Sequence, residues 1–552
     1  MSANVTLRQK IGQLMVFGFA GTAPSKEILS LIREQHVGGI ILFGRNVGTP
    51  EEVLSLTTAL QKEAKESNHK LPLLICTDQE NGVVRRMGEG TTVFPGAMLL
   101  GATQKTENAF AVGQATGKEL KAVGINWNLA PTVDVNNNAE NPVIGVRSFG
   151  EDAQQVAEFS QAWLQGLQQA GVMSTLKHFP GHGDTSVDSH LDLPVIEHDM
   201  TRLRQIELLP FQKGIEAGAD VVMSSHIYFP ALEKRKGVPA TLSRSVMTGL
   251  LREELQFNGV VTTDCLEMNA IAHTIGTAQG AVEALKAGVD LIMISHTHSL
   301  QQDALQAILA AVEQGELEEA RIHEAYDRVQ RLKGKYLSWT ELDVGNVTQH
   351  VPAVVGCEEH LQLAKDIYRQ GITIIDTKSN REIGSLDNNQ PILPLSMDKE
   401  HRVLVLYPQN SYLMQVEDKR YSSYALGQVV QEILPSAMVN EFINPPDQGE
   451  ISRVLEMVQQ LHKNKELDTI IIGSLSAAQS KEQQELINKL AETELPVVVI
   501  AMRSPYDLAY LSSISTYVAT YEFSTPALQM AVRALFGLEQ VSGILPVTLP
   551  QA

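Results

Sequence analysis

The sequence is poor in cysteine, in aromatic residues and in long apolar runs. Its 552 residues include 3 cysteines, Cys76, Cys265 and Cys357, and 5% aromatic residues. An odd number of scattered cysteines excludes a disulfide scaffold and is typical of a reducing compartment, so we expect a cytoplasmic protein. No apolar run approaches the roughly 18 residues of a membrane span, and we expect no membrane partner.

Positive charge is also scarce. The chain has 44 Lys and Arg against 64 Asp and Glu, a formal net charge of −20. Nucleic acids and anionic membranes bind clustered basic residues, so this balance excludes both as main partners. The 43% hydrophobic and 20% charged residues are typical of a globular protein rather than a disordered one.

A segment near the start imitates a secretory signal. Residues 11–23 follow Arg8 and Lys10 and contain a short apolar run that Gln13 interrupts. The pattern is weak, because only two basic residues precede it. We expect a native helix leading into a strand here, with cleavage and secretion as the lesser alternative.

Short apolar runs alternate with amphipathic segments over residues 1–340. Apolar strands that alternate with helices predict parallel pairing. Eight such units fit a TIM (β/α)8-like barrel better than an open sheet. The strands are expected at 15–21, 37–46, 71–80, 125–135, 172–178, 219–226, 259–265 and 289–294. The helices between them include 51–66, 152–170, 244–255 and 278–287, and Gly124, Gly171, Gly218 and Gly288 stand where helices end.

A second α/β pattern follows an aperiodic segment. We expect a catalytic domain over 1–340, a linker over 341–356 and a C-terminal domain over 357–552. The pattern of the last part predicts an open, mostly parallel sheet in an αβα sandwich. Its strands are expected at 372–376, 402–407, 438–442, 469–472, 496–501 and 517–521. No GxGxxG or GxxxxGK[ST] motif occurs in it, so no nucleotide cofactor is expected.

Three residues of the C-terminal domain, Arg503, Tyr506 and Asp507, follow an expected strand. A ligand can bind at such a position. We nevertheless favour plain packing of this domain against the barrel over a role in binding substrate or a partner.

Polar residues stand at the carboxyl ends of the expected N-terminal strands. Barrel enzymes keep their active sites at this rim. Loops also begin there, which by itself accounts for about half of such residues. They are Arg45, Asp78, Asp134, Lys177, His178, His226, Asp264, Ser295 and His296.

The segment 177–194, KHFPGHGDTSVDSHLDLP, is the richest in titratable groups. His178, His182 and His190 fall within 13 residues, beside three aspartates. Metal binding is one interpretation, but no HExxH or CxxC pairing supports it. Acid/base chemistry is the second, because Asp188 can orient the imidazole of His190 and stabilise its protonated form. The third is a loop pinned by its own side chains, which we favour for His182.

Three further segments carry candidate groups. In GVVTTDCLEM (259–268) Asp264 ends an apolar strand, where it serves either as a nucleophile or as a helix cap. In TDQENGVVRR (77–86) Asp78 can accept hydrogen bonds from substrate hydroxyls, and Arg86 is either a ligand or a brace. In NPVIGVRSFGED (141–152) Arg147 stands in a long loop.

Together these motifs resemble glycoside hydrolase family 3, and within it the beta-N-acetylglucosaminidases of the NagZ type. KHFPGHGDT with a trailing DSH is highly specific, and TDQE, NPVIGVRSF and TDCLEM agree in order and spacing over about residues 6–340. The rest of the chain resembles the family's C-terminal α/β-sandwich domain. The resemblance implies that Asp264 is the nucleophile, His190 the acid/base and Asp188 its partner. It implies that the sugar-binding residues are Asp78, Arg86, Arg147, Lys177 and His178.

Two positions depart from the family pattern. Asn81 stands where the family's DQEGG motif has Gly, and Cys265 follows the nucleophile where the family's TDDL motif has Asp. Asn tolerates positive φ less well than Gly, so we expect an altered loop at the first position. The second places a thiol beside Asp264.

The resemblance implies a retaining exo-beta-N-acetylglucosaminidase that removes terminal GlcNAc from peptidoglycan fragments during cell-wall recycling in a bacterium. Its partner is a small carbohydrate, a GlcNAc-containing muropeptide or disaccharide, and neither a metal nor an organic cofactor is implied. A GlcNAc phosphorylase stays open, because a neutral imidazole repels phosphate less than a carboxylate does. A beta-glucosidase or beta-xylosidase of the same family, a metal-dependent barrel hydrolase and a non-catalytic binding protein also stay open.

Overall fold

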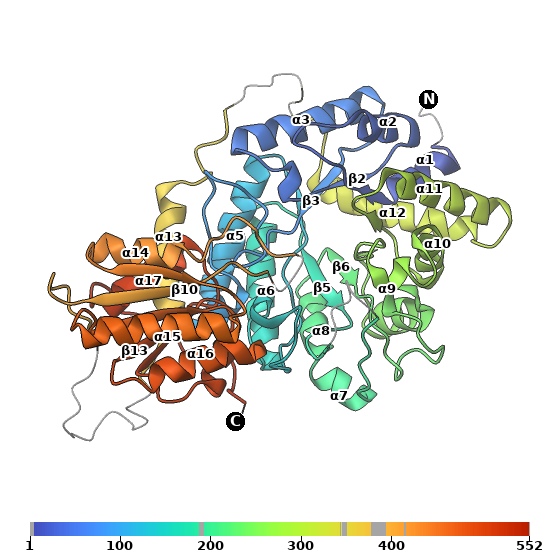
Figure 1. Cartoon of the computed structure of the whole chain (residues 1–552). Helices are drawn as coiled ribbons and strands as arrows, with labels where there is room; N and C mark the ends of the chain where they lie inside the picture. Colours follow the sequence, from blue (N-terminus) through green and yellow to red (C-terminus); the bar gives the residue numbers. More distant parts are fainter. Residues whose placement is uncertain are drawn as a thin grey trace.

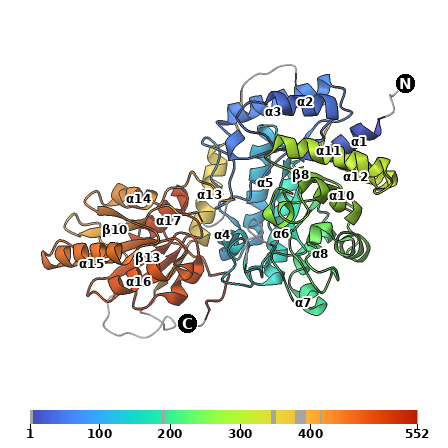
Figure 2. The same ribbon diagram turned by 45° about the vertical axis from the view of Figure 1, so that its right-hand side comes forward.

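The computed structural model describes residues 5–186, 193–342, 344, 350–376, 393–412 and 416–550. The chain forms two lobes that lie side by side (Figure 1). We name the part from α1 (Leu7–Gln13) to α12 (Glu319–Tyr336) the N-terminal lobe and the part from β9 (Thr373–Asp376) to α17 (Thr525–Leu535) the C-terminal lobe. Helix α13 (Glu358–Gly371) lies between the lobes (Figure 2) and contacts α4 and α5 on one side and α17 on the other.

Within the described part of the N-terminal lobe, eight short parallel strands form, one in each expected place. They form a five-stranded sheet in the order β4-β3-β2-β1-β8 and a three-stranded sheet in the order β5-β6-β7. Single parallel bridges, Trp127–Met173 and Thr262–Leu291, stand between the two sheets. The strands are therefore not observed as one closed sheet. They are β1 (Met15–Phe17), β2 (Gly39–Leu42), β3 (Leu74–Thr77), β4 (Trp127–Asn128), β5 (Thr175–Phe179), β6 (Val221–Ser224), β7 (Val260–Thr262) and β8 (Ile292–Ile294).

The strand expected over 125–135 is much shorter than the sequence pattern indicated. Pro131, which has no N–H to donate, follows β4 closely. The chain beyond β4 still bonds to both neighbours, since Leu129 N donates to Thr77 O at 2.9 Å and Val133 N donates to Lys177 O at 2.8 Å. The apolar pattern thus reflects burial between two strands without a regular ladder.

The helices of the N-terminal lobe begin and end where local signals stand. Thr49 and Glu52 form a capping box at the start of α3, and Gly288 ends α10 in the left-handed conformation. The helix expected over 244–255 is a π-helix, Ser245–Glu254, rather than an α-helix. The helices are α1 (Leu7–Gln13), α2 (Lys26–Gln35), α3 (Pro50–Glu66), α4 (Ala97–Ala102), α5 (Thr106–Ala122), α6 (Ala153–Gln169), α7 (Met200–Gln205), α8 (Leu209–Glu216), α9 (Asn269–Ala272), α10 (Thr277–Ala287), α11 (His298–Glu313) and α12 (Glu319–Tyr336).

The segment that imitates a signal peptide is part of the folded lobe. Helix α1 leads directly into β1, and Val16 and Phe17 are fully buried. The expectation of a helix leading into a strand is confirmed. Among the helices in the described residues, none combines the length and the apolar character needed to cross a membrane.

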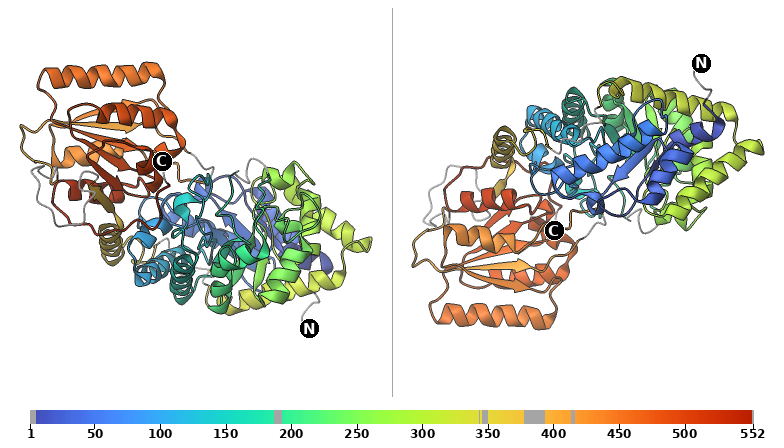
Figure 3. Two further views of the ribbon diagram at one scale, coloured as in Figure 1. Left: turned by 90° about the horizontal axis from the view of Figure 1, so that it is seen from below. Right: turned by 90° about the horizontal axis from the view of Figure 1, so that it is seen from above.

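The described residues of the C-terminal lobe form a six-stranded sheet in the order β11-β10-β12-β13-β14-β9. Five strands are parallel, and β9 pairs antiparallel with β14. Helices lie on both faces of this sheet (Figure 3), so the expected mostly parallel sheet is confirmed. The strands are β9 (Thr373–Asp376), β10 (Val403–Pro408), β11 (Met438–Phe442), β12 (Thr469–Ser474), β13 (Val497–Ala501) and β14 (Thr516–Ala519). The helices are α14 (Ala425–Ile433), α15 (Gln448–Lys463), α16 (Lys481–Ala491) and α17 (Thr525–Leu535).

One of the two apolar clusters of the described residues spans both lobes. Buried residues of α4 and α6, such as Leu99 and Trp163, belong to the same cluster as Ile471 and Val499 of the C-terminal sheet. The end of the chain lies between the lobes (Figure 3), where Ile544 N donates to Ala102 O at 3.0 Å. Because burial of apolar surface is the main favourable term in folding, separating the lobes exposes a substantial part of this core.

Candidate active site

A cavity of about 270 Å³ lies at the carboxyl ends of the N-terminal strands. Its floor is apolar and includes Ile41, Leu129, Met223 and Met293. Most of the polar residues expected at this rim line it, and they come from the ends of β3, β5, β7 and β8 and from the loop after β4. These polar lining residues include Asp78, Glu80, Arg147, Lys177, His178, His182, Asp264, Cys265, Glu267, Ser295 and His296.

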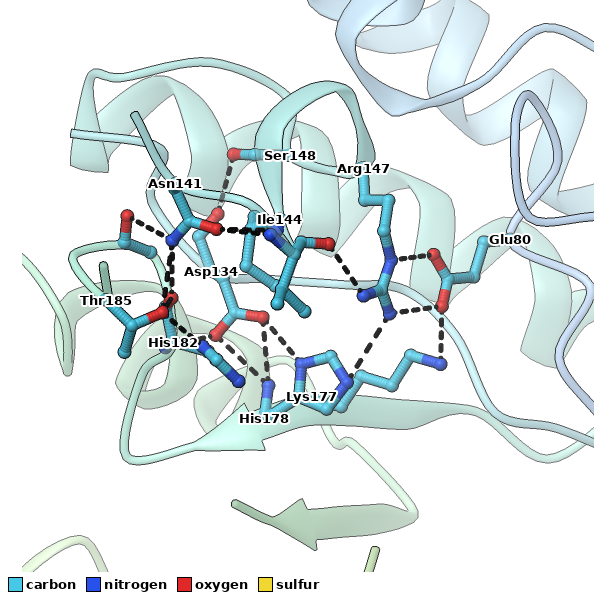
Figure 4. A network of polar contacts seen from close by, with 12 residues as sticks. Glu80, Asp134, Asn141, Ile144, Arg147, Ser148, Lys177, His178, His182 and Thr185 are labelled. Carbon is cyan, nitrogen blue, oxygen red and sulfur yellow. Dashed lines mark hydrogen bonds and ion pairs between the residues drawn. The ribbon is translucent and has the colours of Figure 1, made fainter. Parts of the chain in front are cut away.

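One side of the cavity, which we name the polar wall, consists of Asp78, Glu80, Arg147, Lys177 and His178. Arg147 donates to the Glu80 carboxylate from Nε at 2.9 Å and from Nη2 at 2.8 Å. The Nζ of Lys177 lies 2.6 Å from a Glu80 oxygen and 3.0 Å from Asp78 Oδ1. Figure 4 shows the two cations converging on Glu80. Their ion pairs fix the side chains before any substrate binds.

The charges of the polar wall reinforce one another. Burial alone would raise the pKa of Glu80, but the adjacent Arg147 and Lys177 hold it well below its usual range. Burial likewise opposes the charge of Lys177, and the carboxylates of Glu80 and Asp78 nevertheless raise the pKa of this ammonium group. Glu80, Arg147 and Lys177 therefore stay ionised at neutral pH.

A second network holds His178 from behind. Its Nδ1 lies 2.7 Å from Asp134 Oδ2, and Asp134 Oδ1 accepts the backbone N–H of His182 at 2.7 Å (Figure 4). The pKa of Asp134 is lowered, because the neighbouring His178 outweighs the effect of its burial. Asp134 thereby orients the imidazole of His178 and leaves its Nε2 side toward Arg147, 3.5 Å away.

His182 is tied into its own loop. Its Nδ1 lies 2.8 Å from Thr185 Oγ1, and Asn141 Nδ2 donates to its carbonyl oxygen at 2.9 Å. Burial, together with the neighbouring His178, lowers the pKa of His182 to about 4. These contacts agree with the interpretation of His182 as a residue that shapes the loop.

The other side of the cavity, which we name the Asp264 wall, consists of Asp264, Cys265, Glu267 and His296. Asp264 Oδ1 accepts the N–H of Cys265 at 2.7 Å. The Glu267 carboxylate accepts the N–H groups of His296 at 2.6 Å and of Thr297 at 3.0 Å. Burial raises the pKa of the Cys265 thiol to about 12. Asp264 thus lines the same cavity as a wall that carries two cations.

Arg86 does not line the cavity as the described residues form it. Its Nη2 lies 3.7 Å from Asp78 Oδ2, and its Nη1 donates to Val416 O at 2.7 Å. Val416 belongs to the C-terminal lobe and itself lines the cavity. Of the two interpretations of Arg86, these contacts favour the brace, which connects the C-terminal lobe to the polar wall.

The C-terminal residues that the sequence singled out lie elsewhere. Arg503 pairs with Glu417, Tyr506 OH accepts a hydrogen bond from Asn136 at 2.9 Å, and Asp507 accepts the Ser474 hydroxyl at 2.6 Å. None of the three is among the described residues that line the active-site cavity. Arg503 and Asp507 bond within the C-terminal lobe, and Tyr506 contacts the N-terminal lobe through Asn136. Val416 reaches the cavity from a loop that the sequence did not single out.

Asp188 and His190 lie in residues 187–192, outside the described residues. Their roles stay predictions. At the first departure from the family pattern, Asn81 adopts φ of 71°. Its side chain compensates for this conformation, because it accepts from Gln79 Nε2 at 3.1 Å and donates to Thr116 Oγ1 at 3.0 Å. Asn81 therefore adopts the left-handed backbone conformation that favours glycine.

Sequence reasoning missed Glu80, Glu267 and Val416. Glu80 carried a usable signal, since it follows β3 three residues after Thr77 and shares the cavity end of that strand with Asp78. Glu267 stands in a loop, where an acidic residue is ordinary. Val416 had no signal, because an isolated apolar residue in a loop does not predict which cavity it reaches.

Among the residues that the structure describes, two groups of three side chains could hold a metal ion, with their ligand atoms within 4.8 Å of one another. One is Cys265, Glu267 and His296 in the Asp264 wall. The other is Asp184, His198 and Glu207, beside the loop that holds His182.

Comparisons with known proteins identify the family of the chain. The model of the Glycosyl hydrolase family 3 N terminal domain matches residues 6–332. The chain is 33% identical over 572 residues to Beta-hexosaminidase A of Pseudoalteromonas piscicida, which covers 96% of this chain and 92% of the relative. It is 36% identical over 302 residues to a Beta-hexosaminidase of Stenotrophomonas maltophilia (strain K279a), over 53% of this chain and 87% of the relative. A solved glycoside hydrolase family 3 beta-N-acetylglucosaminidase from Paenibacillus sp. str. FPU-7 superposes with a TM-score of 0.89 at 39% identity, over 99% of both chains.

The likeness to the Pseudoalteromonas and Paenibacillus proteins includes both lobes, and the family model spans the lobe that holds the cavity. The resemblance that the sequence motifs indicated is confirmed. The chain belongs to glycosyl hydrolase family 3 and is a glycoside hydrolase.

Proposed function

We propose that the protein is a retaining exo-beta-N-acetylglucosaminidase that removes terminal non-reducing GlcNAc. One observation carries the proposal: the Asp264 carboxylate lines the same small cavity as a rigid polar wall of Asp78, Arg147, Lys177 and His178. A carboxylate can attack an anomeric carbon while fixed charged groups hold the hydroxyls of the same sugar. The names of the relatives, beta-hexosaminidase and beta-N-acetylglucosaminidase, support this substrate class.

The proposed fold follows from the strand order. β1 pairs with both β2 and β8, and the single bridges stand where β4 meets β5 and β7 meets β8. This circular order supports an irregular (β/α)8 barrel, whose active site lies at the carboxyl ends of the strands. We propose the domain division 1–340, 341–356 and 357–552, with α13 as the first element of the C-terminal domain.

The proposed mechanism has two steps. Asp264 attacks the anomeric carbon while His190, oriented by Asp188, protonates the departing oxygen, and a covalent glycosyl-enzyme forms. His190 then removes a proton from water, which attacks the same carbon and releases the sugar with its configuration retained. Arg147 and Lys177 donate hydrogen bonds to the sugar hydroxyls, and Asp78 accepts them.

The size of the cavity supports exo action. Its volume of about 270 Å³ lies just below the roughly 300–1,000 Å³ of pockets for drug-sized ligands. A volume of this size supports binding of one terminal sugar. Muropeptides or GlcNAc-containing disaccharides from peptidoglycan are the proposed substrates, and cell-wall recycling in the cytoplasm is the proposed setting.

The test is to incubate the protein with muropeptides and to identify the released sugar and its anomer. We expect free GlcNAc, first released as the β-anomer. Release of the α-anomer would contradict nucleophilic attack by Asp264. Glucosamine-1-phosphate derivatives formed in phosphate buffer would make the protein a phosphorylase instead. Release of glucose or xylose from aryl glycosides, without release of GlcNAc, would identify a beta-glucosidase or beta-xylosidase.

The acid/base role of His190 has its own test. His190→Ala should slow the release of poor leaving groups far more than that of activated aryl groups, because activated groups depart without a proton. An equal loss for both kinds of substrate would exclude His190 as the proton donor.

A further inference from the structure

We propose that Cys265, Glu267 and His296 form a binding site for one thiophilic divalent cation, such as Zn²⁺ or Cd²⁺, and that its occupation inhibits the enzyme. The three ligand atoms, a thiol sulfur, a carboxylate oxygen and an imidazole nitrogen, lie within 4.8 Å of one another. All three side chains line the cavity. The site goes beyond the proposed function, and only its inhibitory effect rests on that function.

The spacing of the ligand atoms suits a tetrahedral ion. Zinc binds sulfur at about 2.3 Å and carboxylate oxygen at about 2.0–2.2 Å, so a tetrahedral ion holds the two atoms about 3.5 Å apart. Cys265 Sγ and a Glu267 oxygen are 3.9 Å apart. A shift of a few tenths of an ångström brings them to the required separation.

Two of the three ligands are already oriented. The Glu267 carboxylate is fixed by the backbone N–H groups of His296 and Thr297, at 2.6 and 3.0 Å. The His296 ring packs against Phe43, with ring centroids 5.2 Å apart. His296 is also exposed, so an ion arriving from solvent reaches this ligand first.

The chemistry of the ligands selects the kind of ion. Thiolate and imidazole favour zinc and similar soft or borderline ions, whereas Mg²⁺ and Ca²⁺ require oxygen ligands. Binding displaces the thiol proton of Cys265 into solvent, and the thiolate and the Glu267 carboxylate then neutralise the two charges of the ion. The Arg45 guanidinium opposes the ion, but it lies against the Phe43 ring and donates to Ser295 O at 2.6 Å.

The second group of potential ligands does not fit an ion as well. In Asp184, His198 and Glu207, the Arg202 guanidinium already lies 3.8 Å from Asp184 and 3.4 Å from Glu207. A positive group therefore occupies the place next to both carboxylates. Among the described residues, only these two groups bring three such ligand atoms together, and the Cys265 group is the better site.

Three protein ligands leave the fourth position of the ion open, as in other three-ligand zinc sites. Cys265 adjoins Asp264, whose Oδ1 accepts its N–H at 2.7 Å. A bound cation therefore attracts the carboxylate that must attack the sugar and takes up space in the cavity. Both effects lower turnover.

Binding is tested without reference to activity, by titrating the protein with Co²⁺ as a zinc surrogate. We expect one Co²⁺ per chain, a thiolate-to-cobalt charge-transfer absorption and tetrahedral d–d bands, all removed by competing Zn²⁺. Cys265→Ser should abolish the charge-transfer band. Cys265→Ser and His296→Gln should each weaken Zn²⁺ binding by at least about 10- to 100-fold, because even the loss of an outer-shell partner costs this much.

The matched controls are Cys357→Ser, which removes a half-buried thiol outside the cavity, and His198→Gln in the second group. Both variants should bind like the wild type. Asp264→Asn should also keep the band, so a failure of the proposed catalytic role does not obscure the site. Absence of the band in the wild type, its persistence in Cys265→Ser, or its loss in His198→Gln would each overturn the proposed site.

Inhibition is measured as the ratio of each variant's rate with and without Zn²⁺. The wild type should lose most of its activity and recover it with a chelator. The Cys265→Ser and His296→Gln variants should need at least about 10- to 100-fold more Zn²⁺ for the same fractional loss. Full turnover by a wild-type enzyme that holds the ion would refute the inhibitory effect.

Discussion

The two sides of the cavity differ in how their side chains are held. In the polar wall, Glu80, Arg147 and Lys177 bond to one another through buried ion pairs of 2.6–2.9 Å. In the Asp264 wall, the carboxylates of Asp264 and Glu267 accept backbone N–H groups of their own and neighbouring loops. Ion pairs between side chains fix the first wall, and loop backbone orients the second.

This difference makes the two walls suitable for different parts of the proposed reaction. Groups that hold a sugar gain from rigidity, because preorganised hydrogen bonds need no reorganisation during the reaction. The proposed nucleophile, Asp264, must approach the anomeric carbon and then release it, and the backbone N–H of Cys265 orients its carboxylate. The polar wall therefore suits binding, and the Asp264 wall suits bond formation.

The largest effect is expected from Asp264→Asn, which tests whether the Asp264 wall takes part in bond formation. An amide cannot form the covalent intermediate, so we expect kcat for an aryl beta-GlcNAc to fall about 10⁴-fold or more. KM should change little, because the polar wall is intact. Asp303→Asn, an exposed substitution on α11, serves as the control and should keep full activity. Near-normal turnover by Asp264→Asn would contradict the nucleophile assignment.

The second test is Glu80→Gln in the polar wall. It removes a largely buried negative charge, whose side chain is 6% exposed, from between Arg147 and Lys177. We expect the free energy of unfolding to fall by about 3–5 kcal/mol. Denaturant unfolding measures this change. The control is Glu216→Gln, which breaks an exposed ion pair with Lys213 of 2.8 Å and should change stability far less. Equal effects of the two substitutions would mean that the polar wall is not held by its ion pairs.

These sites also show what the sequence could predict. The eight N-terminal strands were predictable because both of their faces are buried, which gives apolar runs between helices. Asp264, Lys177 and His178 were predictable because barrel enzymes keep polar groups where such strands end. The short β4 was not, because the apolar pattern over 125–135 records burial and carries no information on ladder regularity.

Contacts between distant segments explain the remaining misses. Glu80 gains its importance from Arg147 and Lys177, which are 67 and 97 positions away along the chain. Val416 reaches the cavity only because the C-terminal lobe docks against the loop that holds Arg86. Short-range sequence patterns carry no information on contacts between segments so far apart in the chain. The sequence therefore identified some residues of each wall, but not the contacts that bring these residues together.

The third prediction concerns how stability depends on pH through His182, whose backbone N–H bonds to the Asp134 carboxylate that orients His178. Burial lowers the pKa of His182 from about 6.5 to about 4. Between these values the imidazole of His182 binds a proton in the unfolded chain but not in the folded chain. The contribution of His182 to the free energy of unfolding is therefore fully present above pH 6.5 and is lost as the pH falls toward 4. His182 alone accounts for about 3 kcal/mol of this loss.

His182→Asn should flatten that part of the stability curve, as measured by denaturant unfolding at several pH values. The control is His323→Asn on α12, which removes a histidine whose side chain is 44% exposed and should leave the slope unchanged. A slope between pH 4 and 6.5 that His182→Asn does not alter would exclude this residue as its source.

The smallest expected effect concerns Arg86, through which the C-terminal lobe braces the polar wall. Arg86→Gln removes the contact with Asp78 at 3.7 Å and the hydrogen bond to Val416 O at 2.7 Å. Loss of one charge-assisted bond of about 1.5 kcal/mol predicts a decrease in kcat/KM of about 10-fold. The decrease should appear in KM, because the proposed role of Asp78 is to bind substrate and not to take part in bond formation.

Arg420→Gln separates this brace from simple docking of the lobes. Arg420 also crosses between the lobes and donates to Arg86 O at 3.2 Å, but it pairs with Asp418 rather than with Asp78. If Arg86 acts by positioning Asp78, Arg420→Gln should leave KM nearly unchanged while weakening the contact between the lobes. If both substitutions raise KM equally, the C-terminal lobe acts through its docking alone, and the polar wall needs no support beyond its own ion pairs.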